Sequence, residues 1–145
     1  MRQSLGFTRI KRILVVEDDQ AIRNTLKLLL ESLGLGPATL SVSNGVEATR
    51  ILASEEVDLL ITDFQMPEMD GIELLNWCRS RQMHVPVIFI SANAELVESE
   101  EIALKDCCAT LMNKPMDMEA MIAAIEAAES MMHHPHCTHN RVTPV

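Results

Sequence analysis

The stretch Ile13-Leu14-Val15-Val16-Glu17-Asp18-Asp19 decides the fold of this chain. It begins with four aliphatic residues in a row and ends in three acidic residues. An unbroken apolar run, rather than an alternation of apolar and polar residues, is typical of a strand that is buried on both faces. Residues 13–16 are therefore predicted to form a central parallel strand with carboxylates at its carboxyl end.

Similar apolar runs recur along the chain and alternate with amphipathic stretches. The runs predict strands at 13–16, 38–43, 57–62, 85–90 and 109–113. The amphipathic stretches predict helices at 21–33, 46–55, 72–82, 94–105 and from Asp117, as its cap, to about 132. Strands that alternate with helices predict a parallel sheet covered on both faces, which is an α/β fold.

Length and charge narrow the class of protein. The chain has 145 residues, which suits one domain, and a formal net charge of -9. An acidic chain argues against a nucleic-acid partner and an anionic membrane, because both are bound by Lys and Arg. No apolar run is long enough to span a bilayer. We expect an N-terminal extension (1–10), one folded domain (11–132) and a His-rich flexible tail (133–145).

The cysteines indicate a cellular compartment. The chain has four of them, and Cys107 and Cys108 are adjacent, which suits a disulfide framework poorly. A reduced, cytoplasmic protein is the simpler interpretation.

Polar residues follow four of the predicted strands. They are the acidic stretch 17–19, Asp63, Ser91 and Lys114. Ligands of open parallel sheets bind outside the carboxyl ends of the strands, so these groups are expected to converge. Clustered carboxylates repel one another unless a cation is present, and a small set of oxygen ligands suits Mg²⁺. A carboxylate can also attack phosphorus to give an aspartyl phosphate, whose oxygens Mg²⁺, Lys114 and the Ser91 hydroxyl would stabilise.

Four segments carry a family resemblance. They are Ile13 to Asp19, Asp63-Phe64-Gln65-Met66-Pro67 with Asp70-Gly71, Ser91-Ala92, and Lys114-Pro115. In order and separation they resemble the receiver domain of two-component response regulators, above all stand-alone, chemotaxis-type regulators, over residues 11–132. The resemblance implies a doubly wound (βα)5 flavodoxin-like three-layer sandwich with parallel strand order 2-1-3-4-5.

The resemblance also implies roles for individual residues. Asp63 is similar to the phosphoacceptor, Ser91 occupies the position of the switch hydroxyl, and Lys114 resembles the lysine that contacts the phosphoryl group. The implied ligands of Mg²⁺ are the acidic pair, the phosphoacceptor and one backbone carbonyl, contributed by Asp18, Asp19, Asp63 and Gln65.

Phosphorelay signalling is the function that follows from this resemblance. A sensor histidine kinase or histidine phosphotransfer protein would phosphorylate Asp63, and the domain would be no enzyme beyond its own dephosphorylation. Gln65 and Asn93 lie where the family tunes that hydrolysis. Output would pass through a downstream protein, from a monomer or a weak homodimer formed by the fourth helix, fifth strand and fifth helix.

The sequence departs from the family at two places. Leu111 stands where an aromatic residue often changes rotamer with the switch hydroxyl, and the chain has no Tyr at all. Cys107-Cys108 replaces the usual Gly-Ala pair before the last strand. The resemblance therefore leaves the route of signal transmission open, with backbone shifts of the Ser91 loop as one possibility.

Other interpretations stay open at this level. Taken singly, Asp18 or Asp19 could cap a helix, Ser91 could form a turn and Lys114 could be a solvated charge. The whole chain could be a phosphorylation-independent interaction module with this fold. An aspartate-based phosphatase is disfavoured, because such enzymes carry a second Asp where this chain has Gln65.

The C-terminal tail contains a cluster of potential metal ligands. They are His133, His134, His136, Cys137 and His139. Such a tract can bind Zn²⁺, Ni²⁺ or Cu²⁺. Pro135 and the absence of periodicity favour a disordered tail that binds metal only adventitiously.

Overall fold

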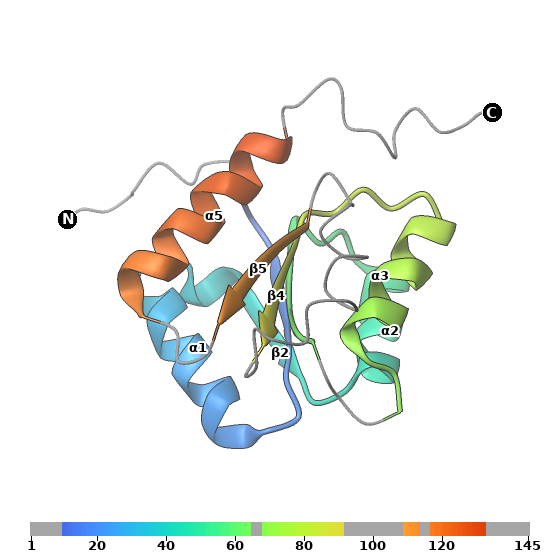
Figure 1. Ribbon diagram of the computed structural model, residues 1–145, viewed down its shortest axis with the longest axis horizontal. Helices are drawn as coiled ribbons and strands as arrows, with labels where there is room; N and C mark the ends of the chain where they lie inside the picture. The colour runs from blue at the N-terminus through green and yellow to red at the C-terminus, as the bar shows by residue number, and fades with distance from the viewer. Residues whose placement is uncertain (1–9, 65–67, 92–108, 114–116, 133–145) are drawn as a thin grey trace.

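The computed structural model describes residues 10–64, 68–91, 109–113 and 117–132 (Figure 1). The strands are β1 (Ile13–Val16), β2 (Thr39–Val42), β3 (Leu59–Asp63), β4 (Val87–Ser91) and β5 (Ala109–Asn113). The helices are α1 (Gln20–Ser32), α2 (Gly45–Ser54), α3 (Gly71–Ser80) and α5 (Met118–Met132), with a 3₁₀ turn, η1 (Gly36–Ala38), before β2. Each of these strands and α-helices lies within two residues of its predicted bounds. The predicted helix at 94–105 lies outside the described residues.

All five strands are parallel and are ordered β2-β1-β3-β4-β5. Helices α1 and α5 cover one face of the sheet, and α2 and α3 cover the other (Figure 1). The doubly wound, flavodoxin-like fold predicted from the sequence is therefore confirmed. The central position of β1 agrees with the apolar run that predicted it.

The strands fill both layers of the core because successive side chains point to opposite faces of a sheet. Ile13 and Val15 pack on the side of α1 and α5, whereas Leu14 and Val16 pack on the side of α2 and α3. β3 and β4 alternate in the same way. A strand buried on both faces cannot show a polar alternation, which explains the unbroken runs in the sequence.

Side chains cap the helices where the chain leaves the carboxyl edge of the sheet. Asp19, Asn44 and Asp70 each accept a hydrogen bond from a backbone N–H in the first turn of α1, α2 and α3, respectively. Asp117 does the same for α5, as the sequence predicted, by accepting from the Ala120 N–H at 2.8 Å. These caps fix the loops that surround the strand ends.

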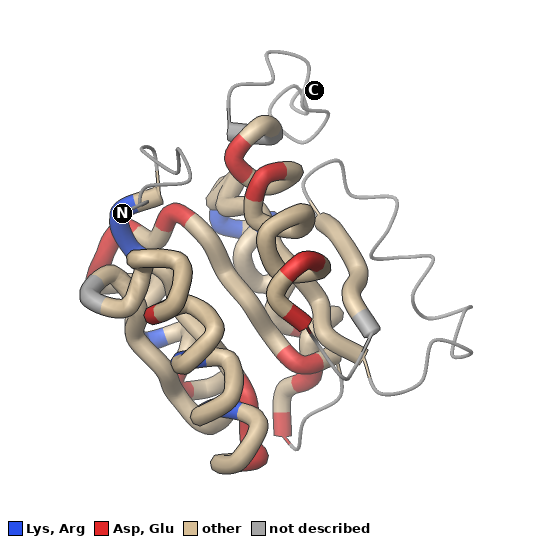
Figure 2. The backbone as a smooth tube through the Cα atoms, turned by 90° about the vertical axis from the view of Figure 1, so that its left-hand side faces the viewer, with Lys and Arg blue, Asp and Glu red and all other residues tan. Residues whose placement is uncertain are grey.

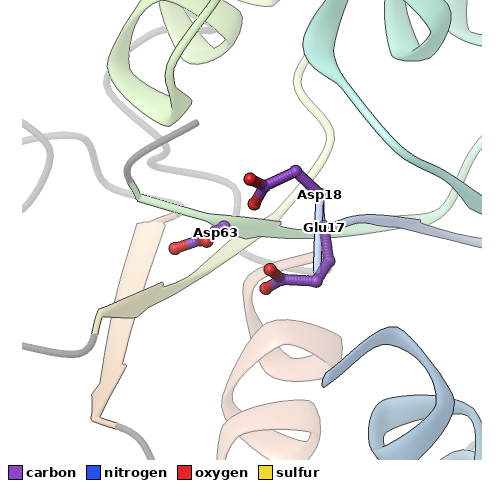
Figure 3. Close-up of side chains that lie close together, drawn as sticks. All are labelled: Glu17, Asp18 and Asp63. Atoms are coloured by element: carbon purple, nitrogen blue, oxygen red, sulfur yellow. The ribbon is translucent and has the colours of Figure 1, made fainter. Parts of the chain in front are cut away.

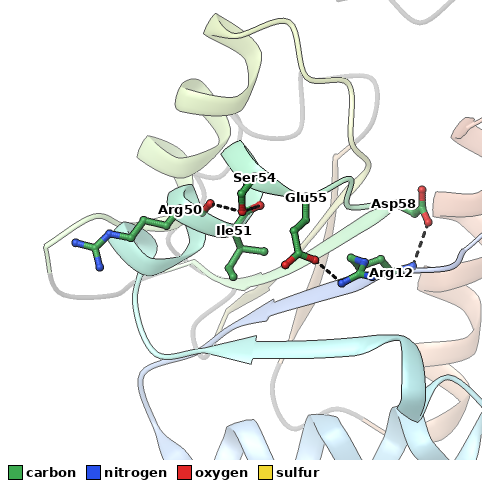
Figure 4. Close-up of polar contacts among 6 residues, drawn as sticks. All are labelled: Arg12, Arg50, Ile51, Ser54, Glu55 and Asp58. Atoms are coloured by element: carbon green, nitrogen blue, oxygen red, sulfur yellow. Dashed lines mark hydrogen bonds and ion pairs between the residues drawn. The ribbon is translucent and has the colours of Figure 1, made fainter.

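At the opposite, amino edge of the sheet, acidic residues have basic or amide partners (Figure 4). The Arg12 guanidinium forms an ion pair with Glu55. The Asp58 carboxylate accepts hydrogen bonds from the backbone N–H groups of Lys11 at 2.8 Å and Arg12 at 3.0 Å. Asp58 therefore ties the segment before β1 to the segment before β3.

Acidic positions outnumber basic ones along the backbone (Figure 2). Several acidic positions lie in loops at the ends of the strands, and others lie along α5 (Figure 2). Within the described residues, no helix has the length and apolar character needed to cross a bilayer.

Candidate functional site

Three carboxylates meet at the carboxyl edge of the sheet. Glu17 and Asp18 follow β1, and Asp63 is the last residue of β3, the neighbouring strand. One oxygen from each side chain can be chosen so that all three lie within 4.8 Å of one another. Figure 3 shows the three side chains around a common space. Glu17 and Asp63 are only 1% and 8% exposed, whereas Asp18 is exposed, so the group is buried at its base and open at its mouth.

Hydrogen bonds hold the loop that carries Glu17. Its backbone N–H donates to the Val42 carbonyl at 3.1 Å, which continues the β1–β2 pairing. Its carboxylate accepts from the Asp19 N–H at 3.1 Å, and its carbonyl accepts from the Arg23 guanidinium at 2.8 Å. The turn after β1 is thus tied to β2 and to α1, and Glu17 stays inside.

The backbone around Asp63 is held equally closely. The Phe64 N–H donates to the Ile90 carbonyl at 2.8 Å, and the Gly71 N–H donates to the Phe64 carbonyl at 3.0 Å. A Cβ atom at Gly71 would lie 2.8 Å from the Asp63 carbonyl oxygen and 2.9 Å from the Phe89 ring. Only a glycine allows α3 to begin this close to the strand end, so the first residue of α3 helps to position Asp63.

The structure places the predicted acidic pair in two different roles. Asp18 joins the carboxylate group, but the carboxylate of Asp19 accepts from the Ile22 N–H at 3.1 Å and caps α1. The third member of the group is Glu17, which the sequence placed in the acidic stretch but not among the candidate ligands. The sequence did contain a signal for Glu17, because it directly follows a strand buried on both faces. An ionisable side chain at that position is expected to lie in the interior.

Ser91 is the last residue of β4 and is 2% exposed. It lies at the same edge as Asp63, whose partner in the register is Ile90. Leu111, in the position of the family's aromatic residue, pairs with Phe89 and packs on the side of α2 and α3. Three predicted site residues lie outside the described residues: Gln65, Asn93 and Lys114.

The donor set fits a small, hard divalent cation. Three carboxylate oxygens in close proximity are the ligand type that Mg²⁺ takes in proteins, and the exposed mouth at Asp18 leaves room for waters. Two of the three carboxylates are buried, where repulsion between like charges is weakly screened. A cation among them would relieve that repulsion.

Comparison with known proteins agrees with this geometry. The family model described as the response regulator receiver domain matches residues 13–126. The chain belongs to the response regulator receiver domain family. Receiver domains of this family act in phosphorelay signalling, and the family binds Mg²⁺ in an acidic pocket such as the one formed here.

Individual relatives support the assignment. The DNA-binding transcriptional regulator NtrC of Escherichia coli (strain K12) is 35% identical over 116 residues, which are 80% of this chain and 24% of the relative. Response regulator MprA of Mycobacterium ulcerans is 35% identical over 118 residues, which are 80% of this chain and 49% of the relative. The chain thus spans about a quarter to a half of these relatives' lengths.

A solved structure shows the same fold. A response regulator receiver domain protein from Clostridium thermocellum has a TM-score of 0.74 and 28% identity, and the match covers 85% of this chain and 97% of that one. Receiver domains are signalling modules rather than classical enzymes, and they interact with histidine kinases and downstream targets.

Proposed function

We propose that Asp63 accepts a phosphoryl group while Glu17 and Asp18 hold Mg²⁺ beside it. The observation that carries this proposal is the meeting of the three carboxylates at the ends of β1 and β3 in a receiver domain. Asp18 and Asp63 were proposed for this site from the sequence. We propose Glu17 in the position that the sequence suggested for Asp19, because the carboxylate of Asp19 caps α1.

The chemistry starts with a carboxylate oxygen of Asp63 as nucleophile. It attacks the phosphorus of a phosphohistidine on a kinase or phosphotransfer protein, the new O–P bond forms, and the P–N bond breaks. The electron pair of that bond returns to the imidazole of the donor. Bound Mg²⁺ supplies positive charge that offsets the charge on the phosphoryl oxygens.

The surroundings of Asp63 suit this role. Asp63 is 8% exposed, and its strand is hydrogen-bonded on both sides by β1 and β4, so the nucleophile is held in one place. Ser91, at the end of β4, is proposed to donate its hydroxyl hydrogen to a phosphoryl oxygen. Lys114 is proposed to contribute a positive charge, and the Gln65 backbone carbonyl a further ligand to Mg²⁺.

Partners follow from the same proposal. A sensor histidine kinase or histidine phosphotransfer protein in the cytoplasm would supply the phosphoryl group, and a downstream protein would receive the signal. The phosphorylated domain would act as a monomer or as a weak homodimer through α5, β5 and the segment before them. Water would later hydrolyse the acyl phosphate, with Gln65 and Asn93 tuning its rate.

Acetyl phosphate tests the proposal without a partner kinase. We expect wild-type protein to gain the mass of one phosphoryl group with acetyl phosphate and Mg²⁺, and none with EDTA. Asp63→Asn should gain nothing, because an amide is not a nucleophile toward phosphorus. Glu56→Gln, which removes an exposed carboxylate at the amino edge, is the matched control and should behave as wild type.

The same experiment distinguishes a phosphorylated receiver domain from a phosphorylation-independent interaction module. A wild-type protein that gains no mass with Mg²⁺ present, and whose spectra do not change with beryllofluoride, would be a phosphorylation-independent interaction module. A gain that persists in Asp63→Asn would move the acceptor to another residue.

A further inference from the structure

The basic residue Arg23 lies in α1, one turn after the cap, and takes no part in the chemistry proposed above. Its guanidinium donates to the Glu17 carbonyl at 2.8 Å. The side chain is half-buried, and its own backbone N–H donates to the Asp19 carbonyl at 2.9 Å. The backbone of Arg23 is thus held within the helix, and its side chain extends back to the acidic loop, residues 17–19.

With the bond made by Arg23, both backbone polar groups of Glu17 have a hydrogen-bond partner. The Glu17 N–H is held by the Val42 carbonyl on β2, and the Glu17 carbonyl is held by Arg23 on α1. The residue is therefore anchored from both sides at its backbone, and its side chain accepts from the Asp19 N–H as well. A hydrogen bond from a charged donor is among the stronger ones in proteins.

The charge of Arg23 also reaches the next loop. Two hydrogen bonds from Ser43 lower the pKa of Glu47 in the first turn of α2, and the charges of Arg50 and Arg23 lower it further.

We propose that Arg23 is a positioning residue for the divalent-cation site, because it fixes the Glu17 carbonyl and with it the direction of the Glu17 carboxylate. This inference rests on the proposed function of the carboxylates. It goes beyond that function because it makes the Mg²⁺ affinity of the site depend on Arg23, a residue that would touch neither the cation nor the phosphoryl group. Partners that orient metal ligands from outside typically change metal affinity by about 10- to 100-fold.

Positioning and charge make opposite predictions for this arginine. If Arg23 acted mainly as a positive charge near the carboxylates, its removal would strengthen the attraction for Mg²⁺. If it acts by fixing Glu17, its removal would let the loop adopt other conformations and weaken Mg²⁺ binding. The fixed geometry at 2.8 Å favours the second effect.

Three variants separate the two effects. Arg23→Met keeps an apolar stem but removes the donor and the charge, and Arg23→Lys keeps a charged donor. Lys27→Met is the matched control, since Lys27 lies one turn further along α1, is exposed and carries the same charge. The dissociation constant of Mg²⁺ is measured by competition with Mn²⁺, followed by electron paramagnetic resonance. Urea unfolding without metal shows that each variant is folded at the titration temperature.

We expect Arg23→Met to weaken Mg²⁺ binding about tenfold. Arg23→Lys should recover most of this loss, and Lys27→Met should stay within about twofold of wild type. Unchanged or tighter binding in folded Arg23→Met, or an equal loss in Lys27→Met, would overturn the inference while the proposed function stands. A wild-type protein that binds no Mg²⁺ would overturn both.

Discussion

The two edges of the sheet use acidic residues in opposite ways. At the amino edge, Glu55 forms an ion pair with Arg12, and Asp58 accepts two backbone N–H groups. At the carboxyl edge, Glu17, Asp18 and Asp63 lie within 4.8 Å of one another. The acids of the amino edge are paired with positive or donor groups of the chain. At the carboxyl edge some acids cap helices, but three carboxylates also gather beside one another.

We infer from this difference that the acids of the amino edge contribute to stability, whereas the three carboxylates of the carboxyl edge serve the function. A carboxylate with a donor partner contributes to the folded state, and the loss of that partner leaves a polar group to be solvated. Carboxylates that face one another in a partly buried site oppose folding unless a cation joins them. The three carboxylates at the carboxyl edge therefore repel one another, and a bound cation would reduce that repulsion.

Loss of one ligand at the carboxyl edge should have the largest effect. Asp18→Asn should weaken Mg²⁺ binding about a hundredfold, because even outer partners of metal ligands change affinity by up to that factor. Without metal, the free energy of unfolding in urea should rise by at most about 0.5 kcal/mol, because the variant removes one of the facing charges and Asp18 is exposed. Calorimetry or Mn²⁺ competition measures the first quantity. A variant that binds Mg²⁺ as wild type does would remove Asp18 from the site.

Asp58 at the amino edge should show the reverse pattern. Asp58→Ala leaves the N–H groups of Lys11 and Arg12 without their acceptor, and we expect the free energy of unfolding to fall by about 2 kcal/mol. Mg²⁺ binding should be unchanged. Urea denaturation followed by Trp77 fluorescence measures the stability, with Glu56→Ala as the control. A change of Mg²⁺ affinity in folded Asp58→Ala would contradict the separation of the two edges.

Gly71 links packing to the site itself. Gly71→Ala would bring a methyl group within 2.8 Å of the Asp63 carbonyl oxygen, so we expect a loss of about 1.5 kcal/mol in stability and slower phosphoryl uptake. Gly34→Ala is the comparison, because Gly34 has a φ of 80° and open space around its Cβ position. That variant should lose stability through backbone strain but keep the uptake rate. Equal uptake rates in the two variants would show that Gly71 does not position Asp63.

The smallest effect is expected at the ion pair of the amino edge. The side chains of Arg12 and Glu55 are 43% and 39% exposed, so water screens their attraction. Arg12→Ala should cost at most about 1 kcal/mol, and high salt should reduce the difference from wild type. Denaturation at low and high salt measures this. A cost above that of Asp58→Ala would reverse the order of contributions proposed for this edge.

The fold was predictable from the sequence because its central strands are buried on both faces. Residues 13–16 coincide with β1, and Asp117 caps the helix for which it was expected. The sequence predicted that the third strand begins at residue 57, but β3 begins at Leu59. The Asp58 side chain instead accepts from the N–H groups of the segment before β1. A contact between segments 46 residues apart leaves no local pattern.

The sequence predicted that the acidic stretch and Asp63 would meet at one edge of the sheet, but it did not identify Glu17 as a member of the group. Three consecutive acids follow β1, and the turn there decides which carboxylates face Asp63. The cap bond of Asp19 and the hydrogen bonds around Glu17 set that turn, and both depend on contacts with α1 and β2. The roles proposed for Gln65, Asn93 and Lys114 stay predictions.

The most direct test locates the phosphoryl group within the chain. Protein treated with acetyl phosphate and Mg²⁺ is reduced with borohydride, which converts an aspartyl phosphate to homoserine, and is then digested for peptide mass spectrometry. We predict homoserine at position 63 only, and none when EDTA replaces Mg²⁺. Homoserine at position 18, or no reduced residue at 63, would contradict the proposal that Asp63 is the acceptor in a carboxylate site for Mg²⁺.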